Sequence, residues 1–308
     1  MKRNVIHTGD ATETLQELPA ESVNMVMTSP PYWNLRDYGV DGQLGREETA
    51  GAFVQNLADV FDEVKRVLRP DGSLWLNLGD TYDDKDLQQI PARVALELQD
   101  RGWILRNRVT WAKPNPMPQS VKDRLNDTTE AVFHFVKERD YWYDLDAIRE
   151  PYSEVTKTKS GNGYKNGSSK RSESDKITDH KGGGGLHDPD RNWDSWVNPA
   201  GKNPGDVFVV TTKPFPEAHF AVYPPELCEK PIKATCPPDG VVLDPFAGAG
   251  TTLLKAKELG REYVGIELNP EYADMARARI GLSPHDPSNV RDDDDQHGLE
   301  AYADGGEP

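Results

Sequence analysis

The chain has 308 residues, with 36 Lys and Arg against 52 Asp and Glu, a net charge of -16 and 36% hydrophobic residues. This length is enough for one large domain or two small ones with a hydrophobic core. No apolar run reaches the roughly 18 residues of a membrane span, and none follows the basic residues near the start, so we expect a cytoplasmic protein without a signal peptide. Its two cysteines, Cys228 and Cys236, exclude a disulfide framework, and without clustered histidines they predict no metal site.

The acidic excess is rich in aspartate, with 31 Asp against 21 Glu, and it is unevenly distributed. A surface dominated by short carboxylates suggests a halophilic source, with an ordinary acidic cytosolic protein as the alternative. The tail from Asp286 holds eight acids and one base, whereas residues 101–124 hold six bases and one acid. The total charge argues against nucleic-acid binding, but one local basic stretch is available for it.

Strands and helices alternate along most of the chain. Apolar patterns predict strands over 4–10, 23–31, 73–80, 131–137, 206–210, 241–243 and 263–267. Helical spacing predicts helices over 11–18, 53–68, 92–102 and 224–236, with further helices after the glycine-rich loop at 244–252 and after residue 267. The composition of 69–72 predicts a turn. This alternation indicates an α/β protein with a mostly parallel sheet covered on both faces.

The pattern collapses between about residue 150 and residue 205, where Gly, Ser, Asn and charged residues dominate. Such a segment is either a disordered insert or a long loop that is ordered against a partner. After Ile280 the sequence predicts a disordered acidic tail.

The glycine-rich loop DPFAGAGTT, residues 244–252, follows an apolar strand and opens a helix. Its glycines let a ligand approach the backbone at the carboxyl edge of a sheet. Glu267 ends the next strand, 23 residues after Asp244, where an acid can accept hydrogen bonds from both hydroxyls of a ribose. The loop lacks a phosphate-binding lysine and has Asp244 at its mouth, which favours a cationic ligand such as a sulfonium. A plain tight turn is the alternative for the loop alone.

A second motif, Ser29-Pro30-Pro31-Tyr32, ends the predicted strand 23–31 and so lies at the same sheet edge. Its prolines fix the backbone and remove two N–H donors, which leaves an acceptor-only cradle. Ser29 Oγ and the Pro30 carbonyl can accept hydrogen bonds from an exocyclic amino group, and Tyr32 offers a stacking face for a flat base. Taken alone, the motif also fits a strand that ends in a simple turn.

Taken together, these segments resemble the S-adenosylmethionine-dependent DNA amino-methyltransferases. The order, with TSPPYW near the amino terminus and LDPFAGAGTT near the carboxyl terminus, resembles the permuted β-class arrangement. The resemblance covers residues 4–280 and includes VLRPDGSLWLNLGD and HFAVYPPELCEKPIKATCPPDG. It implies a Rossmann-like methyltransferase sheet with helices on both faces, circularly permuted, plus an irregular target-recognition insert. It further implies S-adenosyl-L-methionine as cofactor, double-stranded DNA as substrate and no metal.

The resemblance also implies a division of the chain and a set of site residues. The segments are a catalytic half at 1–150, a target-recognition insert at 151–205, a cofactor-binding half at 206–282 and a disordered acidic tail at 283–308. The implied catalytic residues are Ser29, Pro30, Pro31 and Tyr32. The implied cofactor-binding residues are Asp10, His219, Phe220, Tyr223, Asp244, Phe246, Gly248, Gly250, Thr251, Thr252 and Glu267. Among these, Asp10 would border the adenine and Glu267 would take the ribose.

The motif residues favour direct transfer to an amino group. Methylation of carbon 5 requires a thiolate that follows a proline, whereas here Cys236 precedes Pro237 and Cys228 lies in a predicted helix. Within the family, Ser at the first motif position is typical of cytosine-N4 enzymes and Asp of adenine-N6 enzymes. Ser29 therefore predicts cytosine N4, with adenine N6 as the alternative. A flipped base would stack on Tyr32 and be oriented without a strong general base.

Other functions stay open at this point. An RNA or small-molecule methyltransferase, or a catalytically silent nucleic-acid-binding relative, would have a similar fold. DNA recognition is expected from the irregular insert and the basic stretch, with a disordered linker as the alternative for the insert. A separately encoded restriction endonuclease is a possible partner, and the chain is expected to be a monomer or a dimer.

Overall fold

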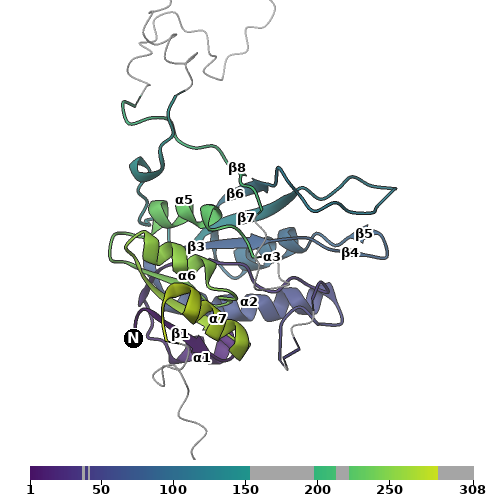
Figure 1. Ribbon diagram of the computed structural model, residues 1–308, viewed down its shortest axis with the longest axis horizontal. Helices are drawn as coiled ribbons and strands as arrows, with labels where there is room; N and C mark the ends of the chain where they lie inside the picture. The colour runs from purple at the N-terminus through teal and green to yellow at the C-terminus, as the bar shows by residue number, and fades with distance from the viewer. Residues whose placement is uncertain (37–38, 41, 153–197, 213–221, 284–308) are drawn as a thin grey trace, which may run out of the picture. The chain divides into compact units, whose positions relative to one another are not determined.

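The protein divides into two compact units, formed by residues 1–144 with 206–308 and by residues 145–205. The computed structural model describes residues 1–36, 39–40, 42–152, 198–212 and 222–283 (Figure 1). The sequence predictions for the central part of the irregular insert and for the acidic tail lie outside the described residues.

The described part of the larger unit contains the helices α1 (Ala11–Glu17), α2 (Ala50–Val67), α3 (Ile90–Asp100), α5 (Pro225–Thr235), α6 (Thr251–Glu258) and α7 (Pro270–Ile280). Three of these helices begin at capping side chains. Asp10, Thr49 and Asn269 accept backbone N–H groups from the first turns of α1, α2 and α7. Gly281, in the left-handed conformation, ends α7.

An eight-stranded sheet runs through this unit in the order β1-β10-β9-β2-β3-β7-β6-β8. Its strands are β1 (Val5–Thr8), β2 (Val23–Thr28), β3 (Leu68–Leu78), β6 (Ile104–Ala112), β7 (Thr129–Val136), β8 (Val207–Val209), β9 (Val241–Asp244) and β10 (Glu262–Glu267). Only β7 runs antiparallel to its neighbours in this sheet. A separate short ladder joins β4 (Tyr82–Asp83) to β5 (Asp86–Leu87).

The last two strands of the described residues lie inside the sheet. β10 pairs with β1, with Val5 opposite Val264, and β9 pairs with β2, with Met25 opposite Val242. The unit β9-α6-β10 from the end of the sequence is therefore inserted between the first two strands of the chain. This connectivity confirms the predicted permuted α/β fold with a mostly parallel sheet.

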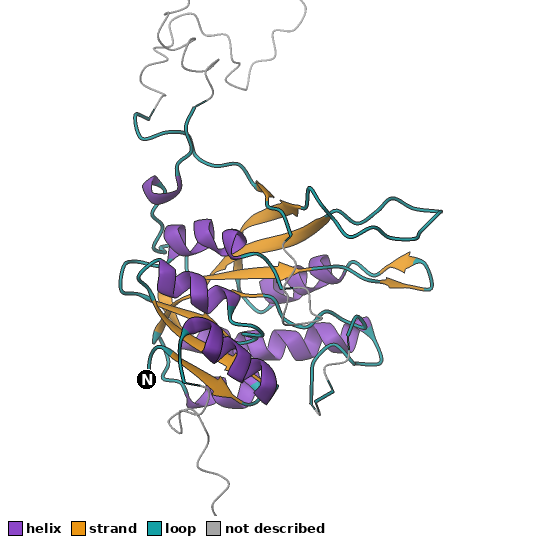
Figure 2. Cartoon of the chain, viewed as in Figure 1, coloured by secondary structure: helices purple, strands orange, loops and turns teal. Residues whose placement is uncertain are grey.

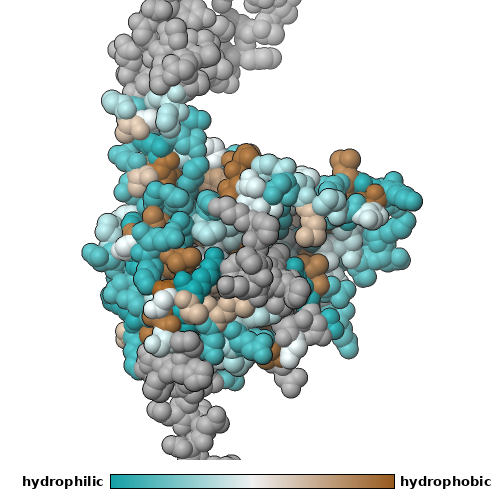
Figure 3. All heavy atoms as spheres, in the orientation of Figure 1, coloured by the Kyte–Doolittle hydropathy of each residue, from teal (hydrophilic) through white to brown (hydrophobic). Residues whose placement is uncertain are grey.

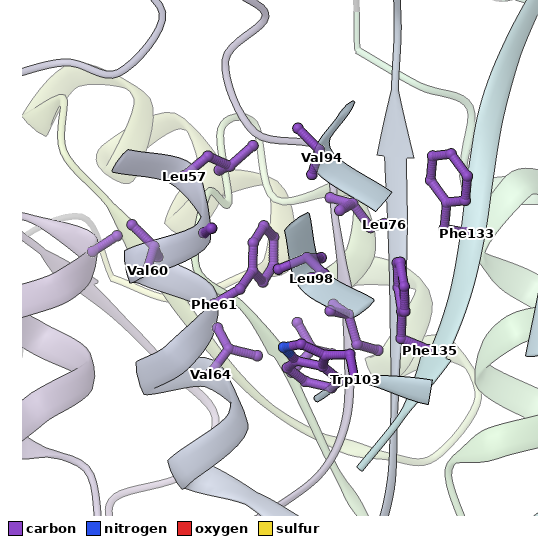
Figure 4. Close-up of a cluster of buried hydrophobic side chains, with 14 of the residues drawn as sticks. Leu57, Val60, Phe61, Val64, Leu76, Val94, Leu98, Trp103, Phe133 and Phe135 are labelled. Carbon is purple, nitrogen blue, oxygen red and sulfur yellow. The ribbon is translucent and has the colours of Figure 1, made fainter. Parts of the chain in front are cut away.

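Helices cover both faces of the sheet (Figure 2). On one face, α1, α2 and α3 pack into a cluster that includes Leu57 and Phe61 of α2 and Leu98 of α3, together with Phe135 of β7 (Figure 4). On the other face, α5, α6 and α7 pack over Met25, Met27 and their neighbours. Burial on both sides explains the nearly continuous apolar sequence of β2 and β9.

Two local predictions differ from the structure. The strand β6, whose first half carries the exposed residues Arg106, Asn107 and Arg108, was not predicted from the sequence. The predicted turn 69–72 lies within β3, but the register between β2 and β3 shifts there, with Val23 opposite Leu68 and Met25 opposite Ser73. The turn composition therefore marks an irregularity in the strand rather than its boundary.

The described residues of the smaller unit lie at the two ends of the irregular segment. A 3-10 turn, η1 (Asp146–Ile148), is followed by an antiparallel bridge between Glu150 and Lys202. Arg149 donates to the Gly201 carbonyl over 3.1 Å. These bonds bring the two ends of the segment together.

On the face visible in Figure 3, the described residues are mostly hydrophilic. Hydrophobic residues of the described parts form small separate patches on that face. None of the helices in the described ranges has the length and apolarity needed to cross a membrane.

Candidate active site

A cavity of about 1400 Å³ lies at the carboxyl ends of β1, β2, β3, β9 and β10. Open sheets of this kind bind ligands at this edge, because the loops that follow the strands diverge there. Both sequence motifs contribute to the lining. Of the predicted site residues, the cavity is lined by Asp10, Ser29, Pro30, Pro31, Tyr32, Tyr223, Phe246, Gly248, Thr251 and Glu267.

The glycine-rich loop joins β9 to α6. Gly248 and Gly250 have positive φ angles of 50° and 74°, which other residues rarely adopt. A Cβ atom on Gly248 would meet nothing within 4 Å, so this backbone is open to the cavity. A Cβ atom on Gly250 would lie 3.0 Å from the Ala276 side chain of α7. Gly248 therefore faces the ligand space, while Gly250 allows close packing between the loop and α7.

Glu267 at the end of β10 is held by the backbone of two loops. Its Oε2 accepts a hydrogen bond from the Gly248 N–H over 2.7 Å, and its Oε1 accepts one from the Asn269 N–H over 2.9 Å. Burial raises the pKa of this carboxyl group, although both backbone donors lower it. Both oxygens keep further lone pairs, so the carboxyl group can accept hydrogen bonds from a ligand in the cavity.

Asp244 is fully buried beneath the glycine-rich loop, whereas the sequence predicted it at the mouth of the loop. Thr28 donates to its Oδ1 over 2.6 Å, and the Phe246 N–H donates to the same atom over 3.1 Å. Tyr223 donates to Oδ2 over 3.3 Å, and burial raises the pKa of the Asp244 carboxyl group. The position of Asp244 was mispredicted because a polar side chain after a strand can turn back under the loop when buried partners satisfy it.

Three of the predicted cofactor residues lie behind the cavity lining. Asp244 and Thr252 are fully buried, and Gly250 faces α7. Thr252 donates to the Met27 carbonyl over 3.1 Å and contacts the Tyr223 hydroxyl. These residues fix the loop against β2. His219 and Phe220 lie outside the described residues.

The Ser29-Pro-Pro-Tyr motif follows β2 in the cavity wall, with Pro30 buried and the other three residues half-buried. Tyr32 Oη donates to Glu130 Oε2 over 2.7 Å and accepts from Ser29 Oγ over 3.2 Å. Asn77 Nδ2 donates to Tyr32 Oη and to Glu130 Oε2, each over 2.8 Å. Lys113 forms an ion pair with the other oxygen of Glu130. The motif is therefore the end of a polar network that reaches β3, β6 and β7.

Gly79, directly after β3, fixes the ring of Tyr32. A Cβ atom at this position would lie 2.8 Å from Tyr32 Cδ2 and even closer to Cε2. Only glycine allows the loop to pass so close to the ring.

Four residues of this site were not predicted from the sequence: Asn77, Gly79, Lys113 and Glu130. Asn77 interrupts the apolar run 74–78 of the predicted strand 73–80, which was a usable signal for it. Lys113 was noted only as part of the basic stretch, and no sequence signal singled out Glu130.

Neither cysteine has the properties of a nucleophile. Cys228 and Cys236 are both fully buried. Burial raises the pKa of the Cys236 thiol to about 12 and that of Cys228 further. A thiol with such a pKa is protonated at neutral pH and does not attack a base.

Comparisons with known proteins agree with this geometry. The family described as DNA methylase matches residues 23–278. The type II methyltransferase M.XycI of Xanthomonas campestris pv. cyanopsidis is 39% identical over 309 residues, covering 91% of this chain and 88% of the relative.

Two solved structures show the same fold. The PvuII cytosine-N4-specific DNA methyltransferase superposes with a TM-score of 0.64 at 22% identity, covering 90% of this chain and 86% of that chain. A protein of Thermus thermophilus, solved as a complex with S-adenosyl-L-methionine, has a TM-score of 0.55 at 27% identity and covers 90% of this chain and 94% of that chain. The chain therefore belongs to the DNA methylase family whose members methylate the exocyclic N4 or N6 amino groups of bases.

Proposed function

We propose that this chain is a site-specific DNA methyltransferase that methylates the exocyclic N4 of a cytosine flipped out of double-stranded DNA. The observation that carries the proposal is the meeting of the Ser29-Pro-Pro-Tyr motif and the glycine-rich loop in one cavity. This arrangement supports a site in which acceptors for an amino group lie beside a sheet edge suited to a nucleoside. Ser29 at the first motif position favours cytosine N4 over adenine N6.

The residues at the glycine-rich loop fit S-adenosyl-L-methionine, which supplies an electrophilic methyl group on a sulfonium. The backbone at Gly248 is open to the cavity, and Glu267 holds its carboxyl group in a fixed orientation for ribose hydroxyls. Asp10, at the start of α1, lies across from Glu267, because Thr8 pairs with Glu267 in the sheet. Two carboxyl groups at this end favour a cationic ligand over a pyrophosphate.

The other end of the cavity suits a flat base with an amino group. Pro30 and Pro31 line this part of the wall and have no N–H groups, so we expect the Pro30 carbonyl and Ser29 Oγ to be the acceptors. Hydrogen bonds from the amino group to these acceptors would direct the nitrogen lone pair toward the methyl group. Most of the rate acceleration then comes from orientation in a site that excludes water.

The identity of the methylated base tests the proposal directly. DNA is incubated with the protein and S-adenosyl-L-methionine carrying a labelled methyl group, digested to nucleosides and analysed by mass spectrometry. We expect labelled N4-methyldeoxycytidine. Labelled N6-methyldeoxyadenosine would replace the cytosine assignment by the adenine alternative, and the absence of any methylated nucleoside would contradict both. Leu96→Ala on the exposed face of α3 serves as the matched control and should methylate normally.

Half of the six cations of the basic stretch 101–124 are paired with carboxylates of the protein itself. Arg101 forms ion pairs with Asp59, Asp62 and Glu97, and Lys113 and Arg124 also pair with carboxylates. Arg108 is exposed, lines the cavity, and its side chain has no ion pair or hydrogen bond within the described ranges. We therefore propose that Arg108 contacts a phosphate of the bound DNA, with the insert 151–205 as the main target-recognition segment.

Replacing Arg108 by alanine should weaken DNA binding to a similar extent for all sequences. Loss of one phosphate contact also lowers the slope of log K against log salt concentration by about 1. Fluorescence anisotropy with labelled duplexes at several salt concentrations measures both effects. Arg69→Ala removes an exposed arginine at the amino end of β3, away from the cavity, and should leave affinity and slope unchanged. An unchanged slope for Arg108→Ala would show that this arginine makes no phosphate contact.

The acidic surface predicts an unusual response to salt. Repulsion among carboxylates is strongest at low ionic strength, where it should loosen the fold, and molar KCl screens it. We expect the melting temperature and the methylation rate to rise from about 0.1 M KCl, where the Debye length is about 10 Å, toward molar KCl. A sharp fall of both quantities with added KCl would contradict the halophilic interpretation and leave the methyltransferase assignment intact.

The biological setting follows from the proposed activity. Methylation of a specific site protects DNA from an endonuclease that cuts the same sequence. We propose that the chain acts in a restriction-modification system with a separately encoded endonuclease, or as an orphan or viral protective methylase.

A further inference from the structure

Three residues of the polar network, Ser29, Tyr32 and Glu130, are hydrogen-bonded in series. Ser29 Oγ is 3.2 Å from Tyr32 Oη, which is 2.7 Å from Glu130 Oε2. Ser29 lines the cavity where the target amino group is expected. Glu130 ends the series and also lines the cavity, with only 14% of its side chain exposed.

The directions of these hydrogen bonds are set by the donors around Tyr32. Its hydroxyl carries one proton, and both Ser29 Oγ and Asn77 Nδ2 donate to its oxygen. That proton therefore points to Glu130, which as a carboxylate can only accept. The series runs in one direction, from Ser29 through Tyr32 to Glu130.

We propose that this series carries away the proton that the target amine loses on methylation. This inference rests on the proposed function. As the N–CH3 bond forms, the S–CH3 bond breaks and its electron pair stays on sulfur, which leaves a positively charged, methylated amine. The amine gives one proton to Ser29 Oγ, the Ser29 proton moves to Tyr32 Oη, and the Tyr32 proton moves to Glu130. The products are the neutral methylated amine, the thioether and a protonated Glu130, which then releases its proton to solvent.

The surroundings of Glu130 keep it available as the acceptor. Within the described residues, the charged and titratable groups that face it are Lys113, directly after β6, and Tyr32. Lys113 pairs with Oε1, and the neutral Asn77 of β3 donates to Oε2 over 2.8 Å. Both donors stabilise the carboxylate and hold it in place. Glu130 positions Tyr32 through this hydrogen bond and accepts the proton from it.

Single-turnover methylation as a function of pH tests the proton series. In the wild type, the rate should fall at acidic pH, because the series needs an unprotonated carboxylate as its final acceptor. Glu130→Gln keeps an oxygen that can accept from Tyr32 but cannot take up a proton. We expect its rate to fall about 10²-fold and to lose this acidic limb, since acid–base groups contribute about 10²- to 10⁴-fold. Glu138→Gln, an exposed glutamate beyond the other end of β7, should retain the wild-type profile.

Two further variants separate proton transfer from structural damage. Tyr32→Phe keeps the ring but removes the hydroxyl between Ser29 and Glu130, so it should also lose the acidic limb. Glu130→Ala should recover turnover when formate is added as a free carboxylate. Calorimetry with S-adenosyl-L-methionine, and binding of DNA with a fluorescent analogue at the target position, should give wild-type affinities for Glu130→Gln and Tyr32→Phe.

The outcomes distinguish this inference from the proposed function. Wild-type turnover, or a slower rate that keeps the acidic limb, in Glu130→Gln would overturn the proton series and leave the methyltransferase assignment intact. Absence of methylation by the wild type would instead contradict the proposed function.

Discussion

Replacing Glu267 by glutamine weakens the binding of S-adenosyl-L-methionine about 10- to 100-fold. The carboxyl group is expected to accept the ribose hydroxyls, and a hydrogen bond to a charged group contributes about 1.5 to 3 kcal/mol. In the wild type, the backbone N–H groups of Gly248 and Asn269 both donate to Glu267. The glutamine side chain would place its NH2 group, a donor, against one of these two donors. Isothermal titration calorimetry measures the change. Glu262→Gln, on the surface at the start of the same strand, is the matched control and should bind normally.

The same carboxyl group gives the cofactor affinity a pH dependence. Burial raises the pKa of Glu267 above its ordinary value, so protonation begins at a higher pH than for an exposed glutamate. A protonated carboxyl group accepts hydrogen bonds less strongly. Affinity should therefore fall as the pH decreases toward this raised pKa, and Glu267→Gln should lack that dependence. If Glu267→Gln binds as tightly as the wild type at every pH, the ribose role of Glu267 is wrong.

The glycine-rich loop and its partner were predictable because their pattern is local. The strand, the loop and the helix start lie within 241–252, and Glu267 ends the next strand along the chain. Parallel strands bring their carboxyl ends to one edge, so sequence order alone places Glu267 beside the loop. The contact between Gly248 and Glu267 agrees with that placement.

The polar network around Tyr32 was not predictable in this way. Tyr32 and Glu130 are 98 positions apart, and Tyr32 and Asn77 are 45 apart. They meet because β7 pairs antiparallel with β3, which places Asn77 opposite Val132 and brings Glu130 to the cavity. A single sequence contains no sign of which distant strand reverses direction, so a lone glutamate before an apolar strand has no visible role.

The strand β6 was missed for a related reason. Its apolar alternation is interrupted by Arg106, Asn107 and Arg108, and its register with β7 shifts between Leu105 and Asn107. Such an irregularity moves side chains to unexpected faces and removes the period of two that identifies a strand. The charge that made 101–124 look like a nucleic-acid surface was equally ambiguous, since ion pairs neutralise Arg101 on the protein itself.

Replacing Gly79 by alanine should lower the methylation rate by about 10²-fold while cofactor affinity stays unchanged. The new Cβ atom would lie 2.8 Å from Tyr32 Cδ2, so the ring must move away from the loop. Movement of the ring lengthens the bonds from Tyr32 to Glu130 and from Asn77 to Tyr32. A displacement of about 1 Å in an active site can cost about 10²-fold in rate. Single-turnover methylation and calorimetry measure the two quantities, with Gly51→Ala in α2 as the matched control, since its Cβ atom would meet only the Thr49 hydroxyl at 3.9 Å.

A double-variant comparison decides whether the loss acts through Tyr32. Tyr32→Ala alone should also reduce the rate strongly, because the ring and its hydroxyl are removed. In that background the Cβ atom of Gly79→Ala has no ring to displace, so the second substitution should have almost no further effect. Contacting residues show such non-additivity, whereas independent sites add to within about 0.5 kcal/mol. Additive losses in the double variant would mean that Gly79 affects catalysis by another route, and the role of this close contact in holding Tyr32 would be wrong.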